Sequence, residues 1–528
     1  MCRTLPQLTL ITLTLIAHGV FTNAHAATFT VTNTNDSGIG TLRQAILDAN
    51  AGSDADLISF NIPTSDPGFQ LSSQHWRIDV SSAALPAVSN NLTIDGYSQP
   101  GATVNTNTPA QGGSNAQLKI ELRNATGTSI NGLDGLSNNF STLMAARGLA
   151  INGFSSEIQL YGDGAQSVEG CFLGTTIDGT QAATTANVNR IGVRIQGPGA
   201  YRIGGLTPDT RNVISGDSSG IAFFAASNGA RIEGNLIGTN AAGTVGISPR
   251  ATGISTGSYQ TLMIGGTDID ARNVISGNGF WGIYVDTGTF ASAQVLGNFI
   301  GTDWRGSNPV PNGLNPLSPS QSVANVQLFG FTCPIQFGGA LPGEANLIAF
   351  GELAGVMVDR CTNAVQHNRY FGNVGPAIDN VFGGGAVGTT PNDAGDPDSG
   401  GNRLQNFPTL NLPPSFLASG GNSVNLSYLV DSDVANASYP ITVEFYRGAC
   451  GSGGSGVLLG SDTYTAANAS TAKSFLLEAA DGANVLPLVA VAVDAAGNVS
   501  EFAPMLGDVI FRSDFEDVLA PLNRGSCR

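Results

Sequence analysis

The chain has 528 residues, with 39 Asp and Glu against 22 Lys and Arg, so its net charge at neutral pH is −17. Only two of the cations are lysines, Lys119 and Lys473, and such an acidic chain is a poor partner for nucleic acids or anionic membranes. Glycine occurs 70 times and charged residues make up 12%, which favours a turn-rich β protein.

The first 26 residues have the pattern of a secretory signal. Arg3 precedes an apolar run over Leu8–Ile16, and Ala24-His25-Ala26 has the small-x-small form of a cleavage site. The run is too short to cross a membrane, and we find no later apolar stretch that is long enough. We therefore expect a protein that is cleaved near Ala26 and secreted or held at the cell surface, with no transmembrane segment in the mature chain.

Residues 27–56 predict a strand followed by a helix. Thr28–Thr32 reads as an edge strand, and Thr41 with Gln44 matches a capping box at a helix start. One apolar stripe follows, made of Leu42, Ala45, Ile46 and Ala49. Because a stack of coils exposes core and unpaired strand edges at its end, we expect this helix to act as an N-terminal cap.

Residues 57–387 contain a phrase that occurs three times: EGCFLGTTIDGT from Glu169, EGNLIGTNAAGT from Glu233 and LGNFIGTDWRGS from Leu296. Between the copies lie short runs such as NVISG, SGIAFF and ARIEGN, which are typical of strands that end in turns. Since no helical segment separates these strands, the sequence predicts an all-β, right-handed parallel β-helix. We interpret each repeat as three coils of about 21 residues.

Asparagine recurs at the turns of these repeats, where it tolerates left-handed backbone and bonds to nearby main chain. The recurring residues are Asn212, Asn235, Asn273, Asn298, Asn346 and Asn368. Stacked on successive coils, their side chains are expected to hydrogen-bond to one another. Cys171 takes the asparagine position in the first copy, and we interpret it as a small buried residue rather than a nucleophile.

Residues 388–410 have no apolar period and predict an acidic linker loop. Asn392, Asp393, Asp396 and Asp398 precede Gly400 with the oxygen ligands that a Ca²⁺ loop needs, although the downstream bidentate Glu of an EF-hand loop is missing. A calcium site and a solvated acidic turn therefore both stay open. Calcium is the one cofactor that the sequence suggests.

Residues 411–506 change to alternating runs such as SVNLSYLV and YPITVEFYR, which predict a small Ig-like β-sandwich, and residues 507–528 form a C-terminal tail.

Five cysteines follow Ala26. Cys333 and Cys361 lie 28 residues apart near one coil and are candidates for a disulfide. Cys450 and Cys527 are candidates for a second disulfide around the C-terminal domain.

These stretches carry a family resemblance. GTLRQAILDAN, LTIDGYSQPG, NVISGN, GNFIGTD, PNDAGDPDSGGNRLQNFP and VDAAGNVSEF resemble bacterial secreted or surface proteins with right-handed parallel β-helix repeats and a CSLREA-type N-terminal segment. The chain departs from that N-terminal motif at Gly40, where the motif has Cys, and at Gln44, where it has Glu. The resemblance implies an extracellular β-helix protein and supplies no defined reaction.

One group of residues is a candidate catalytic site. A lyase needs a basic side chain near Ca²⁺ or a neutralising Arg, and Arg360 beside Asp359, with Tyr370 half a coil later, is the candidate. A surface ion pair with a packing aromatic explains the same residues. His367, beside Asn368, is interpreted as a hydrogen-bonded turn histidine rather than a catalytic base.

Three aromatic residues are candidates for glycan contact. Trp281, Tyr284 and Trp304 fall in the most regular coils and would form a sugar-stacking platform if exposed, or part of the core if buried. The turn-rich stretch Tyr97–Thr106 is expected to project from the stack as a loop.

The sequence therefore favours an exported non-enzymatic scaffold for cell-surface adhesion, structure or glycan binding, with polysaccharide or surface proteins as partners. The alternative is a polysaccharide lyase or glycoside hydrolase that acts in a groove of the β-helix.

Overall fold

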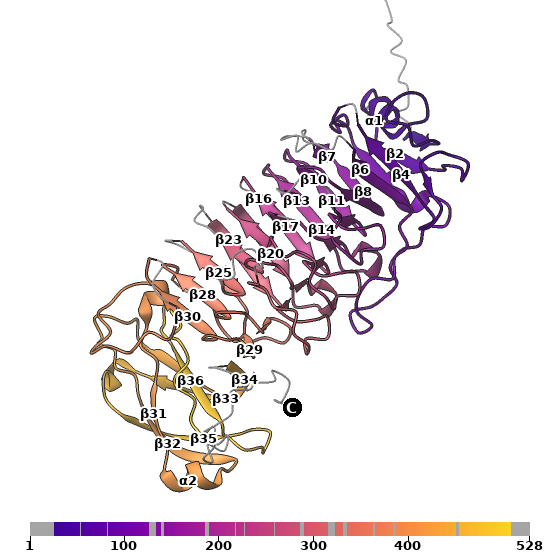
Figure 1. Cartoon of the computed structure of the whole chain (residues 1–528). Helices are drawn as coiled ribbons and strands as arrows, with labels where there is room; N and C mark the ends of the chain where they lie inside the picture. The colour runs from indigo at the N-terminus through magenta and orange to yellow at the C-terminus, as the bar shows by residue number, and fades with distance from the viewer. Residues whose placement is uncertain are drawn as a thin grey trace, which may run out of the picture.

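A computed structural model describes residues 26–507 except 53, 82, 126–133, 139–141, 185–189, 217, 226, 258, 286–289, 315–322, 331–334, 363–364, 384–386 and 450–453. The described chain forms a rod of stacked strands with helix α1 (Leu42–Asn50) at one end and a smaller β domain at the other (Figure 1). Cys333 and the pair Cys450 and Cys527 fall outside the described residues, so the predicted disulfides stay predictions.

Three sheets form the rod. Sheet I runs in the order β1 (Thr28–Val31), β2 (Asp56–Phe60), β5 (Leu92–Asp95), β8 (Met144–Arg147), β11 (Gln166–Glu169), β14 (Tyr201–Gly204), β17 (Asn228–Glu233), β20 (Tyr259–Gly265), β23 (Phe290–Leu296) and β26 (Ile335–Phe337). Every pairing in it is parallel.

Sheet II runs in the order β3 (Phe69–Gln70), β4 (His75–Val80), β6 (Ile120–Asn124), β9 (Leu149–Asn152), β12 (Phe172–Leu173), β15 (Val213–Ile214), β18 (Leu236–Ile237), β21 (Val274–Ile275), β24 (Phe299–Ile300), β27 (Leu347–Ala349) and β29 (Arg369–Phe371). Its pairings are parallel except for the β3–β4 hairpin.

Sheet III runs in the order β7 (Asp134–Asn138), β10 (Ser156–Leu160), β13 (Ile191–Ile195), β16 (Ser219–Phe223), β19 (Thr252–Thr256), β22 (Ile283–Val285), β25 (Val326–Phe329), β28 (Val356–Asp359) and β30 (Ile378–Val381). The chain passes from sheet I to sheet II to sheet III and back, for example through β14, β15, β16 and β17, so each coil adds one strand to each sheet. Long parallel sheets stacked in this way are compatible with the predicted β-helix.

The length of one coil differs from our prediction. The runs NVISG, SGIAFF and ARIEGN form β15, β16 and β17, which are three sides of one coil rather than three coils. β11 begins at Gln166 and β17 at Asn228, 62 residues later, with β14 between them in sheet I. The repeated phrase therefore returns every second coil, and the interpretation of three coils per repeat is wrong.

Asparagine side chains form a ladder along the corner between sheets I and II. Each Nδ2 donates to the Oδ1 of the next, over 2.9 Å from Asn212 to Asn235, 3.0 Å to Asn273, 2.9 Å to Asn298, 3.0 Å to Asn346 and 2.9 Å to Asn368. These are the six residues that the sequence analysis expected to bond to one another, and that expectation is confirmed. All six are buried, so the ladder satisfies polar groups that water does not reach.

A second ladder, which the sequence analysis missed, follows the strands of sheet II. Asn278 donates to Asn312 over 3.0 Å, Asn312 to Asn325 over 2.9 Å, and Asn325 to Asn373 over 3.2 Å. Asn273 and Asn278 thus lie at opposite ends of β21, one in each ladder. Both corners of sheet II are held by stacked amides.

The glycine of the repeated phrase has a conformational role. Gly234 and Gly297 precede ladder asparagines and have φ of +72° and +68°, which disfavours residues with a Cβ. A Cβ on Gly234 would also lie 2.5 Å from the carbonyl oxygen of Gly205. In the phrases EGN and LGN, the glycine therefore makes the backbone turn and the asparagine that follows supplies the amide of the ladder.

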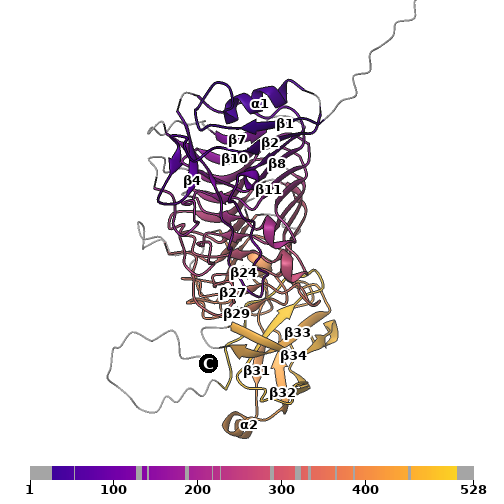
Figure 2. The same cartoon turned by 90° about the vertical axis from the view of Figure 1, so that its right-hand side faces the viewer.

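Both ends of the rod are covered. Thr41 caps α1 by accepting a hydrogen bond from the Gln44 amide, and the predicted apolar stripe is buried in the rod's main core. At the other end, Tyr446 and Phe502 of the C-terminal domain join the same core, and Phe502 packs edge-on against Tyr370 at 6.0 Å between ring centroids. Figure 2 shows α1 above the first strands and the C-terminal domain below the last.

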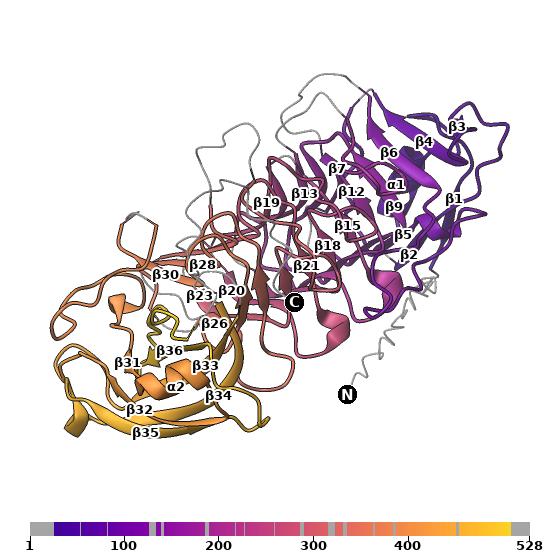
Figure 3. The same ribbon diagram turned by 60° about the horizontal axis from the view of Figure 1, so that its bottom comes forward.

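The C-terminal domain contains two antiparallel sheets, β31 (Thr409–Asn411), β32 (Ser423–Leu429) and β35 (Lys473–Glu478) in one, and β34 (Gly454–Tyr464), β33 (Ile441–Ala449) and β36 (Leu488–Val493) in the other. A short helix α2 (Pro414–Ser419) lies at its outer end, at the bottom of Figure 1 and in front of the strands in Figure 3. Residues of both sheets, including Tyr428 and Phe445, share one buried cluster.

Residues 97–117 form an arm that lies against the outside of sheet II. The expected loop Tyr97–Thr106 belongs to this arm and does not project from the stack. The Arg211 side chain donates to the Gly113 carbonyl over 2.5 Å, and the Ser114 amide donates to the Ala241 carbonyl over 2.6 Å. Beneath the arm lies a buried apolar cluster on the outward side of sheet II that includes Phe172, Val213, Leu236 and Val274.

Removing one rung of the ladder should destabilise the rod. Asn298→Ala deletes the donor to Asn346 and leaves the Asn273 amide without its acceptor, so we expect a loss of roughly 2–4 kcal/mol in unfolding free energy. Asn228→Ala, at an exposed position on β17, is the matched control and should change stability by less than about 0.5 kcal/mol. Denaturant unfolding followed by circular dichroism gives both values, and equal effects would contradict a role for the ladder.

Lengthening the ladder should be tolerated. The Cys171 amide already donates to Asn212 Oδ1, and its buried Sγ lies 3.5 Å from the Ala146 carbonyl, the acceptor that matches the Val168 carbonyl used by Asn212. We therefore expect Cys171→Asn to keep or raise the unfolding midpoint, whereas Cys171→Leu, which cannot make these bonds, should lower it. A higher unfolding midpoint for Cys171→Leu than for Cys171→Asn would show that the site requires only apolar volume.

Candidate functional site

The catalytic candidates are not brought together in one site. Asp359 is buried at the end of β28, where its Oδ1 accepts from the Gly383 amide at 2.9 Å and lies 3.7 Å from Arg360 Nε. Arg360 lies over the rings of Phe329 and Phe382 at 5.6 and 5.9 Å. Tyr370, by contrast, is 2% exposed inside the rod, and burial raises the pKa of its hydroxyl. A phenol enclosed in the core has no access to a substrate, so Tyr370 does not serve as a base.

His367 has a structural contact with the C-terminal domain. Its Nε2 lies 3.1 Å from Glu444 Oε1, and Glu444 also accepts from the Tyr446 hydroxyl at 2.6 Å. The residue adopts φ of +53° beside the ladder residue Asn368. This placement agrees with a hydrogen-bonded turn histidine.

The aromatic candidates fall into two places. Trp281 and Tyr284 pack at 4.6 Å between ring centroids, Phe280 lies 5.9 Å from Trp281, and all three are half-buried at sheet III. Trp304 lies instead on the sheet II side, where it packs on the apolar cluster beneath the arm and its ring carries the Arg305 guanidinium at 4.1 Å. The structure thus separates Trp304 from the other two.

Polar residues flank Tyr284 on the neighbouring strands of sheet III. Tyr284 points outward from β22 and is in register with Ser255 and Gln327 on the neighbouring strands. The Trp281 Nε1 is buried and has no hydrogen-bond partner among the described residues. We refer to Phe280, Trp281 and Tyr284 as the aromatic cluster.

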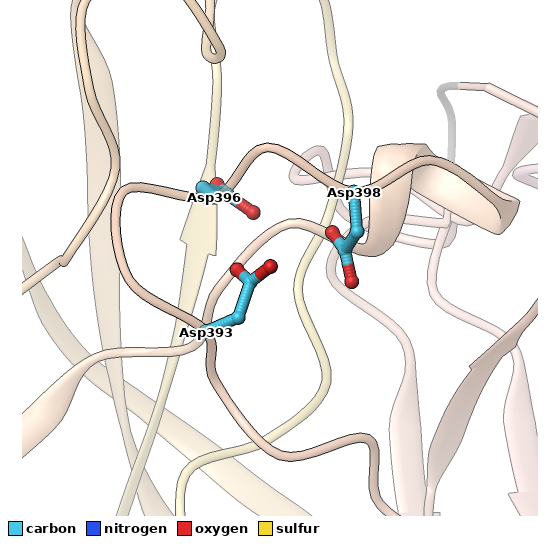
Figure 4. Close-up of side chains that lie close together, drawn as sticks. All are labelled: Asp393, Asp396 and Asp398. Atoms are coloured by element: carbon cyan, nitrogen blue, oxygen red, sulfur yellow. The ribbon is translucent and has the colours of Figure 1, made fainter.

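The acidic loop places three carboxylates together. Ligand oxygens of Asp393, Asp396 and Asp398 all lie within 4.8 Å of one another (Figure 4). Such spacing suits a Ca²⁺ ion, whose oxygen ligands lie at about 2.3–2.6 Å from the metal. Asn392 does not join them, because its amide bonds to the Phe407 main chain at 2.8 and 3.0 Å. The predicted ligand set is therefore reduced to the three aspartates.

The surroundings of Asp396 explain its electrostatics. Its carboxylate accepts from Gln405 Nε2 at 2.7 Å, from the Asn406 amide at 3.2 Å and from the Ser432 hydroxyl. Burial, with repulsion from Asp398 and Asp393, raises the pKa of Asp396 to about 6. Burial and Asp393 likewise raise the pKa of Asp398. A cation at this position would relieve the same repulsion.

Two further carboxyls lie at the joint between the rod and the C-terminal domain. Glu501 accepts from the Asn380 and Thr390 amides at 2.9 and 2.8 Å, and burial, with some repulsion from Asp379, raises its pKa to about 8. Burial also raises the pKa of Asp379 to about 6. The Asp379 Oδ1 is buried without a hydrogen-bond partner among the described residues.

Neither a comparison with protein-family models nor one with curated proteins finds a match to this chain. The resemblance noted in the sequence is therefore supported here only at the level of stacked parallel sheets. None of the helices in the described parts of the chain has the length and apolar character to span a membrane.

The folding stability contributed by Glu501, at the joint between the rod and the C-terminal domain, should fall as pH rises. The folded pKa of Glu501 is about 8 against an ordinary 4.5, so the folded state binds more protons between these values and stability falls from about pH 4.5 to pH 8. Asp379→Asn removes one of the charges that raise this pKa, so its melting temperature should fall less over that range. Thermal unfolding at pH 4.5, 6 and 8 tests this, and parallel curves for the two proteins would contradict it.

Calcium should raise the melting temperature at pH 7.5. Millimolar CaCl₂ is expected to stabilise the wild type by a few degrees through binding the folded state only, and Asp398→Asn, at an exposed ligand, should remove the effect. Asp163→Asn, an exposed aspartate on the rod, is the control and should retain it. An unchanged melting temperature in the wild type would show that the three aspartates form a solvated turn.

Proposed function

We propose that the protein is an exported, non-enzymatic scaffold, built as a right-handed β-helix, whose aromatic cluster binds glycans at the cell surface. The observation that carries the glycan role is the packing of Phe280, Trp281 and Tyr284 in a half-buried group on the outer side of sheet III. Aromatic rings present apolar faces that match the C–H face of a sugar, and the Tyr284 hydroxyl supplies a polar group beside them.

Rigidity supports the scaffold role. The two amide ladders, the helix α1 and the C-terminal domain satisfy or cover the groups that an open stack leaves exposed. Among the described residues, the strongest catalytic candidate is the group of Asp359, Arg360 and Tyr370. Its members are not accessible from one surface, because Arg360 is partly exposed and Tyr370 is buried in the core. The alternative of a lyase or hydrolase therefore has no observation in its favour here.

Export and the family remain parts of the proposal. The signal-like residues 1–26 and the resemblance to secreted β-helix repeat proteins support them. The usual right-handed crossover between parallel strands supports the handedness of the coils.

A screen of neutral oligosaccharides tests the glycan role. We expect binding without release of reducing or unsaturated ends, and at least a tenfold loss of affinity in Trp281→Ala/Tyr284→Ala, because both stacking faces are removed. Tyr161→Ala is the control, since Tyr161 is 45% exposed directly after β10, four strands away from β22 in sheet III, and the variant should bind as the wild type does. Product release would establish an enzyme instead, and equal loss in the control would exclude the aromatic cluster as the site.

A further inference from the structure

One outward column of sheet I holds cationic and neutral residues. In register across successive strands lie Ser167, Arg202, Arg231, Met263, Gln294 and Gln336. Arg202 and Arg231 are neighbours on β14 and β17, and their side chains are 50% and 51% exposed. No carboxylate stands among these six positions, although the chain as a whole carries a charge of −17.

A buried carboxylate positions the arginine pair. Glu233, two residues after Arg231, lies 3.1 Å from Arg231 Nη1 and 3.9 Å from Arg202 Nη2. Its own side chain is only 4% exposed, so the guanidinium groups form the outer layer of the cluster. Arg231 Nη1 also lies 3.1 Å from the Met263 sulfur. Two cations against one carboxylate leave a positive charge facing the solvent.

The nearest other arginine of this face is already neutralised. Arg147 is in register with Glu169 and lies 3.7 Å from Asp95 and 3.6 Å from Asp209. The exposed positive charge is therefore confined to Arg202 and Arg231 within this part of sheet I.

The two sides of the arginine pair differ in the residues that they expose. Small exposed residues flank it on the N-terminal side of the strands: Ala200, Gly229, Thr261 and Ser292. On the C-terminal side, the loops that contain η2 (Pro208–Thr210) and η3 (Ile269–Ala271) expose Leu206 and Ile269 to 43% and 52%. The same loops carry Asp209, Asp268 and Asp270, so the carboxylates of an acidic ligand must face the arginine pair and not these loops.

We propose that Arg202 and Arg231 bind the carboxylates of an acidic polysaccharide that lies along the rod. A guanidinium fork matches a carboxylate with two parallel hydrogen bonds, and strands in a sheet repeat every 4.8 Å or so, which offers successive rungs to a repeating ligand. Ser167 continues the column with a hydroxyl that suits sugar hydroxyls, and Leu206 and Ile269 offer apolar contact to the ring faces. At the other end of the column, Gln294 donates to Gln336 over 2.8 Å and Gln336 donates to Glu344 over 3.4 Å, so the site ends before these residues. The site lies on a different sheet from the aromatic cluster and does not depend on it.

Binding of oligogalacturonate by titration calorimetry at low salt tests the site. We expect measurable binding that weakens as NaCl rises, because exposed charges are screened. Arg202→Gln/Arg231→Gln should lose at least tenfold in affinity, and Arg202→Lys/Arg231→Lys should lose less, since it keeps the charge without the fork. Arg250→Gln/Arg369→Gln changes the net charge equally at two exposed arginines elsewhere and should bind as the wild type does.

Several results would overturn the proposal: absence of binding to oligogalacturonate, equal loss in both Gln double variants, or equal affinity for polyglutamate, which would identify an acidic-peptide surface. Circular dichroism confirms that each variant is folded. If Arg202→Gln/Arg231→Gln still binds neutral oligosaccharides as the wild type does, the arginine surface is separate from the aromatic cluster. If that variant loses both neutral-oligosaccharide and oligogalacturonate binding, the two sites are not independent.

Discussion

Stacked asparagine amides are the interaction on which this structure depends. Each buried amide of the first ladder from Asn212 to Asn346 donates to the next asparagine, and all of them also donate to main-chain carbonyls, for example Asn298 to the Ile264 carbonyl at 2.9 Å. An orphaned buried amide would cost about 1–3 kcal/mol, so every rung requires the next coil to be in register. The ladder therefore turns a stack of separate coils into one cooperative rod.

The register has consequences on the outside of the rod. A slip of one residue would turn the core of a strand outward and move Tyr284, Arg202 and Arg231 to the inside. Because the ladders prevent such a slip, the aromatic cluster and the arginine pair keep fixed positions on sheets III and I. The α1 helix and the C-terminal domain complete the rod by covering its two ends.

The sequence predicted features that depend on local chemistry. The helix with Thr41 as its cap, the first asparagine ladder and the buried Cys171 all follow from spacing and side-chain type. The coil length was mistaken because short strand signals do not reveal whether they are sides of one coil or separate coils. The second ladder escaped notice because Asn312, Asn325 and Asn373 stand outside the repeated phrases that drew attention to the first ladder.

Contacts between distant segments could not be predicted. The arm over sheet II depends on pairs such as Arg211 and Gly113, 98 residues apart, and the end of the rod depends on Phe502 meeting Tyr370. The acidic loop was located from its composition. Only the folded structure shows that the Asn392 side chain bonds to the Phe407 main chain, so that the candidate calcium ligands are the three aspartates.

A double-mutant cycle on Asn273 and Asn298 tests the central claim most directly. Denaturant unfolding of the two Ala variants and their combination gives the coupling energy between the amides, which bond at 2.9 Å. The account predicts a coupling of about 0.5 kcal/mol or more for this pair, and additive effects for Asn212 and Asn373, which belong to different ladders and distant coils. Additivity for Asn273 and Asn298 would show that the stacked amides do not hold the coils together.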